Sequence, residues 1–414
     1  MARTTQLDLT QTAFDAMMKE LYPAGVPENV ATRRHPFLNM VSKRDDFEGD
    51  ALIVPIIYEN PGGRSSTFAD AQTYANASKS LKWVLTQKAD YAVVYIDALA
   101  IRSSRSNKGA FVNARKTEID LMLKALGNSA AHSLYRGGYG AIAQTETNVP
   151  VAPAQDWFEC INHDDARHFS VGMTYEFASG SDGSGVRTGA QYNVCRAVNE
   201  ETGIIYFESN LNGDIAYQDY IFPVGDTVAA GTQLKMTGLA SWIPFTTPSG
   251  GESFFGVDRS VHPTRLAGHR LNATGNSVEE NILTLSESIV RAGGAPDKCF
   301  ISHGNFNNLV KGLGTKVEYD GAGGKADVGF GGVQIHTSAG PITVHPDPDC
   351  PSNRGYCLQM DTWAIHHLDG FPHIDTLDGN NALRQSAADG IEVRARYWGE
   401  LACVAPAWNG VFAI

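Results

Sequence analysis

The sequence contains no long apolar run. Its longest, Ala51 to Tyr58 (ALIVPIIY), is interrupted by Pro55 and falls far short of the roughly 20 residues that a membrane-spanning helix needs. The opening stretch MARTTQLDLTQTAFDAM mixes polar residues with Leu and lacks the apolar core of a signal peptide. These absences predict a chain without a membrane span or membrane partner, made and kept in a cytoplasm.

Cysteine and positive charge are also scarce. The 6 cysteines (Cys160, Cys195, Cys299, Cys350, Cys357, Cys403) include no CxxC pair, which favours buried, reduced thiols over a disulfide framework. Lys and Arg number 33 against 45 Asp and Glu, so the formal net charge is -12. This balance argues against a protein whose main task is to grip phosphates, and any contact with nucleic acid should be weak or confined to patches.

The remaining composition is that of a globular protein. Of the 414 residues, 43% are hydrophobic and 19% are charged, which predicts two or three packed units instead of disorder. The 42 Gly and 18 Pro residues indicate frequent turns, and therefore short strands and exposed loops.

The first hundred residues have too little apolar surface to fold alone. Residues 1–48 hold one weak amphipathic stretch and several prolines, which is typical of an arm that lies on another surface. Residues 50–58 and 82–97 predict two strands, joined by the long polar segment NPGGRSSTFADAQTYANAS. A projecting two-stranded hairpin is marginal in water, so it needs a surface to rest on. Another copy of the chain is a candidate for that surface.

A long helix is predicted next, from Lys108 to Tyr135, after the capping pair Ser106-Asn107 and before Gly137-Gly138. At 1.5 Å per residue it would be about 42 Å long, which suits an elongated molecule. Its predicted packing stripe is Phe111, Ala114, Glu118, Met122, Ala125 and Ser129, with Ile119, Leu123 and Leu126 beside it.

The second half of the chain changes texture twice. Residues 150–250 alternate short strands and turns, which predicts a small β-barrel or sandwich inserted between helical segments. From Ser277 a capping box with Glu280 opens a helix, and further strands and a short helix follow, so a mixed α+β unit with an antiparallel sheet is expected. The apolar final segment should be docked.

Two clusters have metal-ligand residue types without metal-site spacing. The first is His163, Asp164, Asp165 and His168; the second is His345, Asp347, Asp349, Cys350 and Cys357. Both lie in predicted turns, where no helical spacing aligns the ligands, so polar turns are the preferred interpretation. We expect no metal and no cofactor.

Two further patterns resemble parts of nucleotide or catalytic sites. In GAGGK (Gly321 to Lys325) the first Gly of a phosphate loop is missing and Ala326 stands where Ser or Thr is required, so a flexible loop is predicted. His366 and His367 are adjacent on a predicted strand and should point to opposite faces, one buried and one exposed, with no paired base or nucleophile.

The stretch FFGVDRSVHPTRLAG (Phe254 to Gly268) is a further candidate for either a catalytic or a structural role. Asp258-Arg259 lacks a partner set for catalysis, so we interpret the pair as a charge-assisted brace where the β insertion meets the rest of the fold. Phe254 and Phe255 are interpreted as anchors, and Pro263 as the stop before the next element.

The order of these elements resembles the major capsid (coat) protein of tailed bacteriophages, with its Hong Kong 97-like fold. Similar stretches recur in phage coat proteins that carry an inserted β domain: GLASWIP (Gly238 to Pro244), FFGVDRS (Phe254 to Ser260), RLAG (Arg265 to Gly268) and GGAPDKCFISHGNFNNLVKGLG (Gly293 to Gly314). The resemblance implies an N-arm (1–48), an extended loop or E-loop (49–98), a spine helix with the peripheral domain (99–149), an inserted β-barrel domain (150–252), an axial domain (253–388), and C-terminal strands of the peripheral domain (389–414).

The resemblance implies a non-enzymatic protein that assembles with itself. Copies would form hexamers and pentamers of an icosahedral head around double-stranded DNA, which the acidic chain would contact weakly and without sequence preference. Scaffold, portal and decoration proteins would be further partners, and the short region before the first strand favours a separate scaffold or none. The protein would be assembled in the host cytoplasm and reside in the virion capsid.

Candidate inter-subunit contacts are Arg64, Phe68, Lys79 and Lys82, all in the E-loop. Some relatives join subunits by a Lys-Asn isopeptide bond, for which Lys79 or Lys82 with Asn409 would be the candidates. The bond also needs a catalytic acid close by, so surface lysines and a turn Asn are the preferred interpretation. Two other classes stay open: another phage or surface-array structural protein, and a metal-dependent enzyme with a β-barrel attached to an α+β domain.

Overall fold

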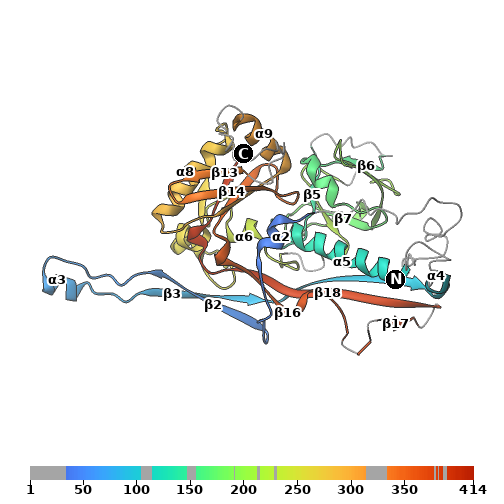
Figure 1. Ribbon diagram of the computed structural model, residues 1–414, viewed down its shortest axis with the longest axis horizontal. Coiled ribbons are helices and arrows are strands. Elements are labelled where there is room, and N and C mark those ends of the chain that lie inside the picture. The colour runs from blue at the N-terminus through green and yellow to red at the C-terminus, as the bar shows by residue number, and fades with distance from the viewer. Residues whose placement is uncertain are drawn as a thin grey trace, which may run out of the picture.

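The computed structural model describes residues 34–103, 114–146, 155–190, 192–211, 215–227, 231–313, 333–376, 379–380, 382–385 and 389–414. The molecule has a compact body and a thin two-stranded projection that extends from one end along the long axis (Figure 1). The predicted arm before residue 34 and the GAGGK loop lie outside the described residues. Among the described residues, no helix is long and apolar enough to cross a membrane.

A long sheet forms the base of the body. Its strand order is β1-β16-β18-β17, and β4 pairs with the other edge of β18. The strands are β1 (Ser42–Arg44), β4 (Lys88–Asp97), β16 (Trp363–Ile374), β17 (Leu383–Arg384) and β18 (Gly390–Cys403). The 14 residues of β18 pair with β16 from Ala395 to Cys403 on one edge and with β4 from Gly390 to Gly399 on the other, so β18 is the central strand of a long sheet (Figure 1).

The predicted long helix is α5 (Ala114–Ser133), which lies along this sheet and contacts β4, β16 and β18. Its packing face differs from the predicted stripe. Met122, Leu126, Ala130 and Leu134 are buried at spacings of four, whereas Ala125 is exposed. The helix has apolar residues on two adjacent faces, and the sheet selects the face that packs.

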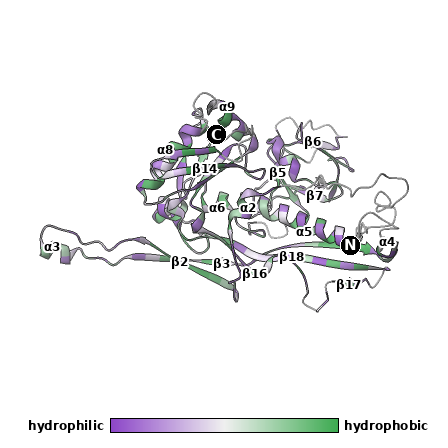
Figure 2. Cartoon of the chain, in the orientation of Figure 1, coloured by the Kyte–Doolittle hydropathy of each residue, from purple (hydrophilic) through white to green (hydrophobic). Residues whose placement is uncertain are grey.

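The projection is a hairpin of β2 (Ala51–Glu59) and β3 (Lys79–Thr86), with the short helix α3 (Phe68–Thr73) at its tip. Hydrophobic residues continue along β2 (Figure 2). The single strand predicted over residues 82–97 is in fact two. After Gln87 the chain leaves the hairpin and β4 joins the long sheet, since β18 offers it an unpaired edge.

The β-rich segment forms a six-stranded sheet of order β5-β10-β7-β8-β9-β6. The strands are β5 (Ala143–Gln144), β6 (Trp157–Glu159), β7 (Thr174–Ala178), β8 (Asn193–Asn199), β9 (Ile204–Phe207) and β10 (Tyr220–Pro223), with 3-10 turns at His163–His168 and Thr188–Ala190. Its core is separate from that of the body and aromatic, with Phe158 packed edge-on against Phe177 and stacked on Phe207.

A second six-stranded sheet, of order β11-β19-β15-β12-β14-β13, is covered by α8 (Val278–Arg291) and α9 (His303–Leu313). The strands are β11 (His269–Leu271), β12 (Lys298–Ile301), β13 (Val333–Thr337), β14 (Gly340–Pro346), β15 (Arg354–Leu358) and β19 (Gly410–Ala413). Helix α8 has the predicted capping box, with Ser277 and Glu280 bonded reciprocally, and buries Ile282, Leu285 and Ile289.

The C-terminal part of the chain contributes strands to both sheets of the body. Strand β16 lies in the long sheet, although it precedes residue 388, and β19 lies in the second sheet, although it follows that residue. The predicted boundary between axial and peripheral residues therefore does not coincide with the division between sheets. The remaining short helices are α2 (Pro36–Met40), α4 (Ala98–Ser103), α6 (Leu239–Trp242) and α7 (Pro263–Ala267), with 3-10 turns at Arg259–Val261, Met360–Thr362 and Pro406–Trp408.

The adjacent histidines on β16 are both buried, so the prediction of one exposed histidine is wrong. His366 is 5% exposed and His367 is 8% exposed. The chain just after β1 covers this part of the strand: Asp46 Oδ1 lies 2.6 Å from His366 Nδ1, and Asp45 Oδ1 lies 3.7 Å from His367 Nδ1. A strand covered on both faces has no solvent side to offer.

Candidate assembly interface

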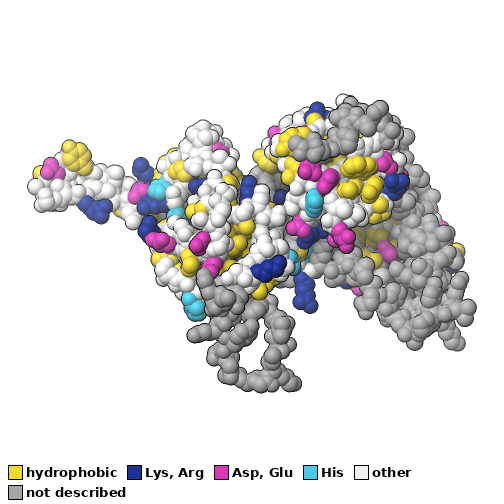
Figure 3. Space-filling view, turned by 90° about the horizontal axis from the view of Figure 1, so that it is seen from above, with side chains coloured by type: hydrophobic (Ala, Val, Ile, Leu, Met, Phe, Trp, Pro, Cys, Tyr) yellow, Lys and Arg dark blue, Asp and Glu magenta, His cyan; other side chains and the backbone are white. Residues whose placement is uncertain are grey.

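The projecting hairpin exposes large apolar side chains that its own chain does not cover. Ile57 is 71% exposed on β2, and at the tip Phe68 and Tyr74 are 82% and 73% exposed. The view from above shows the tip, with its hydrophobic side chains, standing away from the body (Figure 3). Single exposed apolar residues are ordinary, but a row of them on an unsupported hairpin indicates a surface that another molecule covers.

Local interactions form the tip without any buried core. Thr67 caps α3, where its Oγ1 accepts a hydrogen bond from Asp70 N at 3.3 Å. Gly63 has a φ of +91°, and a Cβ there would lie 2.6 Å from the Cα of Ala75, so the turn requires glycine. The tip is thus held in shape by a cap and a close backbone approach, while its apolar side chains point to solvent.

The base of the hairpin is fixed by the aromatic anchor, a cluster of five rings that meet around Trp242: Trp83, Trp242, Phe254, Phe255 and Trp363. Trp83 of β3 lies edge-on to Trp242, with ring centroids 5.4 Å apart. Trp242 Nε1 donates to Leu401 O of β18 at 3.0 Å. The anchor therefore joins the hairpin, the GLASWIP segment and the long sheet.

A tight turn in the FFGVDRS segment supplies a backbone bond to the same hairpin. Phe254 and Val257 exchange two backbone hydrogen bonds, and the two residues between them, Phe255 and Gly256, have φ values of +48° and +83°. This left-handed pair turns the chain back, at the cost of strain at a residue that is not glycine. Phe255 O consequently accepts a hydrogen bond from Val84 N at 3.0 Å.

Arg259 contacts both the aromatic anchor and the backbone of the GLASWIP segment. It is 2% exposed, its Nη1 donates to Ser241 O at 2.5 Å, and its guanidinium lies 3.9 Å from the Phe254 ring centroid. Its ionic partner is Glu252, whereas Asp258 accepts from Ser260 N at 2.9 Å. The predicted pairing of Asp258 with Arg259 is thus wrong, because Asp258 caps the 3-10 turn that Arg259 begins.

The sequence interpretation missed two residues that hold the hairpin. Arg265 of RLAG donates through Nη1 to Tyr58 O at 2.7 Å and to Glu59 Oε2 at 2.6 Å. Trp83 is fully buried although the residues on either side of it in β3 are exposed. The second has a sequence signal, since a lone Trp inside a polar hairpin indicates a packed base; the first has none.

All four predicted contact residues, Arg64, Phe68, Lys79 and Lys82, lie on the hairpin and are exposed. Asn409, the cross-link candidate, is not accessible. It is 0% exposed, its Oδ1 accepts from Gln359 N and Trp363 Nε1, and its Nδ2 donates to Ala405 O at 2.9 Å.

We predict that assembled particles contain no cross-link through Asn409, because reaching its amide would break a fully bonded buried group. On a denaturing gel of particles, the chain should run as a single monomer band. A ladder of bands that Asn409→Asp removes would contradict this expectation.

The structure places the residues of the two clusters with metal-ligand residue types mostly in other contacts. His163 Nε2 lies 3.0 Å from Glu159 Oε1, and with Glu146 they are the one group of three potential ligands that meets among the described residues. Asp164 and Asp165 instead pair with Arg167 and Arg136. In the second cluster His345 stacks on Phe300, Cys350 and Cys357 are buried as free thiols, and Asp347 and Asp349 face the N-terminal segment.

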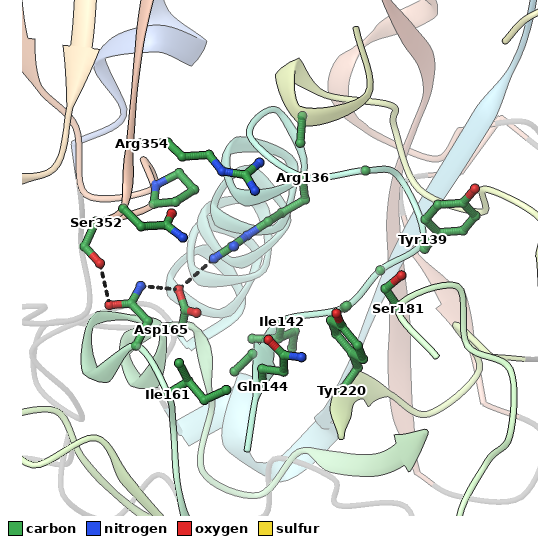
Figure 4. Close-up of a pocket in the computed structure, with 18 residues that line it drawn as sticks. Arg136, Tyr139, Ile142, Gln144, Ile161, Asp165, Ser181, Tyr220, Ser352 and Arg354 are labelled. Atoms are coloured by element: carbon green, nitrogen blue, oxygen red, sulfur yellow. Dashed lines mark hydrogen bonds and ion pairs between the residues drawn. The ribbon is translucent and has the colours of Figure 1, made fainter. Parts of the chain in front are cut away.

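A cleft of about 570 Å³ lies where the end of α5, the β-rich segment and the second sheet meet (Figure 4). A chain of hydrogen bonds crosses it, from Ser352 to Asn162, from Asn162 to Asp165, and from Arg136 to the same carboxylate at 2.6 Å. Burial raises the pKa of Asp165 although Arg136 opposes this. These hydrogen bonds make the cleft a polar joint between three parts of the chain.

Residues 215–385 match the sequence model of a family described as SU10 major capsid protein, a span that includes the aromatic anchor's Trp242, Phe254 and Phe255. The resemblance to tailed-phage major capsid proteins is confirmed. The matched family is a structural one that forms the capsid of a phage. Among curated proteins, no sequence matches this chain.

A solved capsid structure supports the fold. The cyanophage A-1(L) capsid asymmetric unit superposes with a TM-score of 0.56 at 12% identity, covering 98% of this chain and 99% of that one. The capsid of the cyanophage P-SCSP1u (TM-score 0.47, 10% identity, 100% and 98% covered) and that of a native GTA particle (0.46, 8%, 96% and 94%) are also similar. Nearly the whole chain thus has the mixed helix and sheet fold of the first capsid subunit.

Proposed function

We propose that this protein is the major capsid protein of a tailed phage, and that its copies form hexamers and pentamers of an icosahedral head enclosing double-stranded DNA. One observation carries the proposal: the hairpin β2–β3 projects from the body with exposed Ile57, Phe68 and Tyr74, while its base is rigidly anchored. A rigid base and an uncovered apolar tip suit a loop that lies on a neighbouring subunit.

The parts of the chain fit the predicted roles in a Hong Kong 97-like fold. The hairpin is the E-loop, α5 the spine helix, the long sheet the core of the peripheral domain, and the second sheet with α8 and α9 the axial domain. The β-rich segment is the inserted β-barrel. Two hydrogen bonds support closure of the sheet into a barrel. Glu146 N donates to Glu159 O and Ile161 N donates to Gln144 O, both at 2.9 Å, and these bonds join the chain at the two end strands β5 and β6.

The remaining expectations follow from surface chemistry. A net charge of -12 suits a shell wall that DNA contacts weakly and without sequence preference. The protein would act in the virion capsid after assembly in the host cytoplasm, with scaffold, portal and decoration proteins as further partners, and without catalysis. Arg64, Lys79 and Lys82 would contribute the polar rim around the apolar tip contacts.

The tip variant Phe68→Ser with Tyr74→Ser tests the proposal. Because neither ring is buried in the single chain, the variant should keep the wild-type unfolding midpoint while closed shells become at least about tenfold fewer, as expected when apolar interface anchors are removed. The measurements are urea unfolding of unassembled protein, and negative-stain microscopy with light scattering of assembly reactions.

Val171→Ser with Met173→Ser is the matched control, since these residues are exposed at 65% and 43% on the β-rich segment, away from the hairpin. It should assemble as wild type. Wild-type protein that stays monomeric with and without a candidate scaffold would overturn the proposed function, and tubes or flat sheets would favour a tail or surface-array protein instead.

A further inference from the structure

The segment that leads into α2 is held by buried polar side chains far away in the sequence. His35 is 8% exposed; its Nδ1 lies 2.5 Å from Asp349 Oδ2, and its Nε2 lies 2.7 Å from Asn128 Oδ1 of α5. Two residues on, Phe37 N donates to Asp347 Oδ2 at 3.0 Å. The loop after β14 and the spine helix thus hold residues 35–37 from two sides.

Both ring nitrogens of His35 face oxygen acceptors. A neutral imidazole has one N–H and can donate only one of these two hydrogen bonds, whereas the imidazolium donates both. Asp349 is 2% exposed, so it supplies a negative charge that is shielded little by water. The geometry therefore fits the protonated form of His35 better than the neutral form.

The surroundings contain further charged and titratable groups. From the loop after β14 these are Asp347 and Asp349; from α5 and its end, His132, Tyr135 and Arg136; from the 3-10 turn of the β-rich segment, Asp165 and His168. Tyr135 donates its hydroxyl to Asp347 Oδ2 at 2.9 Å, and His168 Nδ1 lies 4.0 Å from Asp349 Oδ1.

We propose that His35, held between Asp349 and Asn128, is a pH-sensitive latch that fixes the N-terminal segment α2–β1 to the spine helix and the second sheet. The latch is closed when the imidazole is protonated and loosens when it loses its proton. What it holds is extensive: Phe37 packs against Tyr135 and Phe300 at centroid distances of 5.4 and 5.1 Å, and β1 pairs in parallel with β16.

The direction of the pH effect is the same for two groups. Burial acts to lower the pKa of His35, but the hydrogen bond and charge of Asp349, with Asn128, outweigh it and raise that pKa above its ordinary value. A raised histidine pKa gives stabilisation that is complete below the unfolded value and is lost as the pH rises through the folded one. Burial, then Asp349, raises the pKa of Asp347 to about 6, so its ionisation with rising pH also costs stability.

Hydrogen exchange of the unassembled full chain, followed by mass spectrometry, tests the latch. After correction for intrinsic rates, peptides covering residues 35–41 should exchange at least roughly fivefold faster at about pH 8.5 than at about pH 6, while α8 peptides change less. His35→Gln can keep one hydrogen bond but cannot titrate, so its peptides should lose most of this pH dependence.

The matched control is His163→Gln, which alters another His-carboxylate contact, with Glu159 at 3.0 Å in the β-rich segment, and should leave the pH dependence at residues 35–41 unchanged. Should His35→Gln fail to fold, an NMR titration of His35 in the wild-type chain decides alone. A His35 pKa at or below its ordinary value, or an unchanged pH dependence in His35→Gln, would overturn the latch; a raised pKa together with the lost dependence supports it.

Discussion

Arg259→Ala is expected to abolish shell formation and to destabilise the subunit by about 3–5 kcal/mol, the range for removing one partner of a buried ion pair. The substitution leaves Ser241 O and the Glu252 carboxylate without their donor, and it removes the cation from the Phe254 ring. Since Glu252 keeps some access to water, the lower end of the range is more realistic. Urea unfolding and the yield of soluble protein measure the effect.

Asp258→Ala is the matched control beside it. Asp258 is only partly buried and its carboxylate caps the short turn at Ser260 N, so this variant should unfold and assemble nearly as wild type. If Arg259→Ala instead gave normal shells at normal yield, the role of Arg259 in holding the base of the hairpin would be dispensable. Equal losses in the two variants would point to the turn itself and not to the guanidinium.

Glu400→Gln is expected to make the protein more stable than wild type at neutral and alkaline pH. Glu400 is 0% exposed, and burial raises its pKa to about 8, against the hydrogen bonds from Thr237 N and Leu401 N and the charge of Lys88. In the folded state the carboxyl is thus largely neutral at pH 7. Glutamine has the same shape, still accepts from Thr237 N, and never ionises.

The sign follows from proton binding. Between the ordinary pKa of a glutamate and about 8, the folded chain holds a proton that the unfolded chain has released, so wild-type stability falls as the pH rises, by about 1.4 kcal/mol per pH unit from this group. The stability difference between Glu400→Gln and wild type should therefore grow by several kcal/mol, on this order-of-magnitude basis, from about pH 5 to about pH 8.

Urea unfolding of unassembled protein at several pH values checks this expectation. Glu392→Gln changes another glutamate of β18, one that pairs with Arg394 near the start of the strand, and its difference from wild type should vary much less over the same range. A difference for Glu400→Gln that stays flat with pH would mean that the carboxyl is ionised in the folded state.

Local sequence signals predicted the elements whose causes are local. The capping box at Ser277 and the apolar spacing of α8 were confirmed, because both depend on residues within four positions of each other. The hairpin and the β-rich segment were predicted from alternation and turn residues in the same way. The six cysteines are free and buried in the described structure, as their spacing indicated.

Contacts between distant residues could not be predicted in this way. The predicted packing stripe of α5 continued from Met122 through Ala125, and only the sheet beneath decided that Leu126 and Ala130 are buried with Met122 instead. Arg259 had an adjacent acid in Asp258, but neighbouring side chains on a turn diverge, and Glu252 is the residue that faces it.

The sequence by itself determined that this is an acidic, globular, strand-rich chain with a projecting hairpin, a long helix and a capsid-like order of elements. The tertiary structure alone decided where the chain leaves the hairpin and continues as β4. It also decided that FFGVDRS binds the base of the hairpin through Phe255 O, and that His35 contacts Asp349, 314 positions away in the sequence. The physical reason is that local patterns set backbone conformation within a few residues, whereas these contacts exist only once separate sheets have closed over one another.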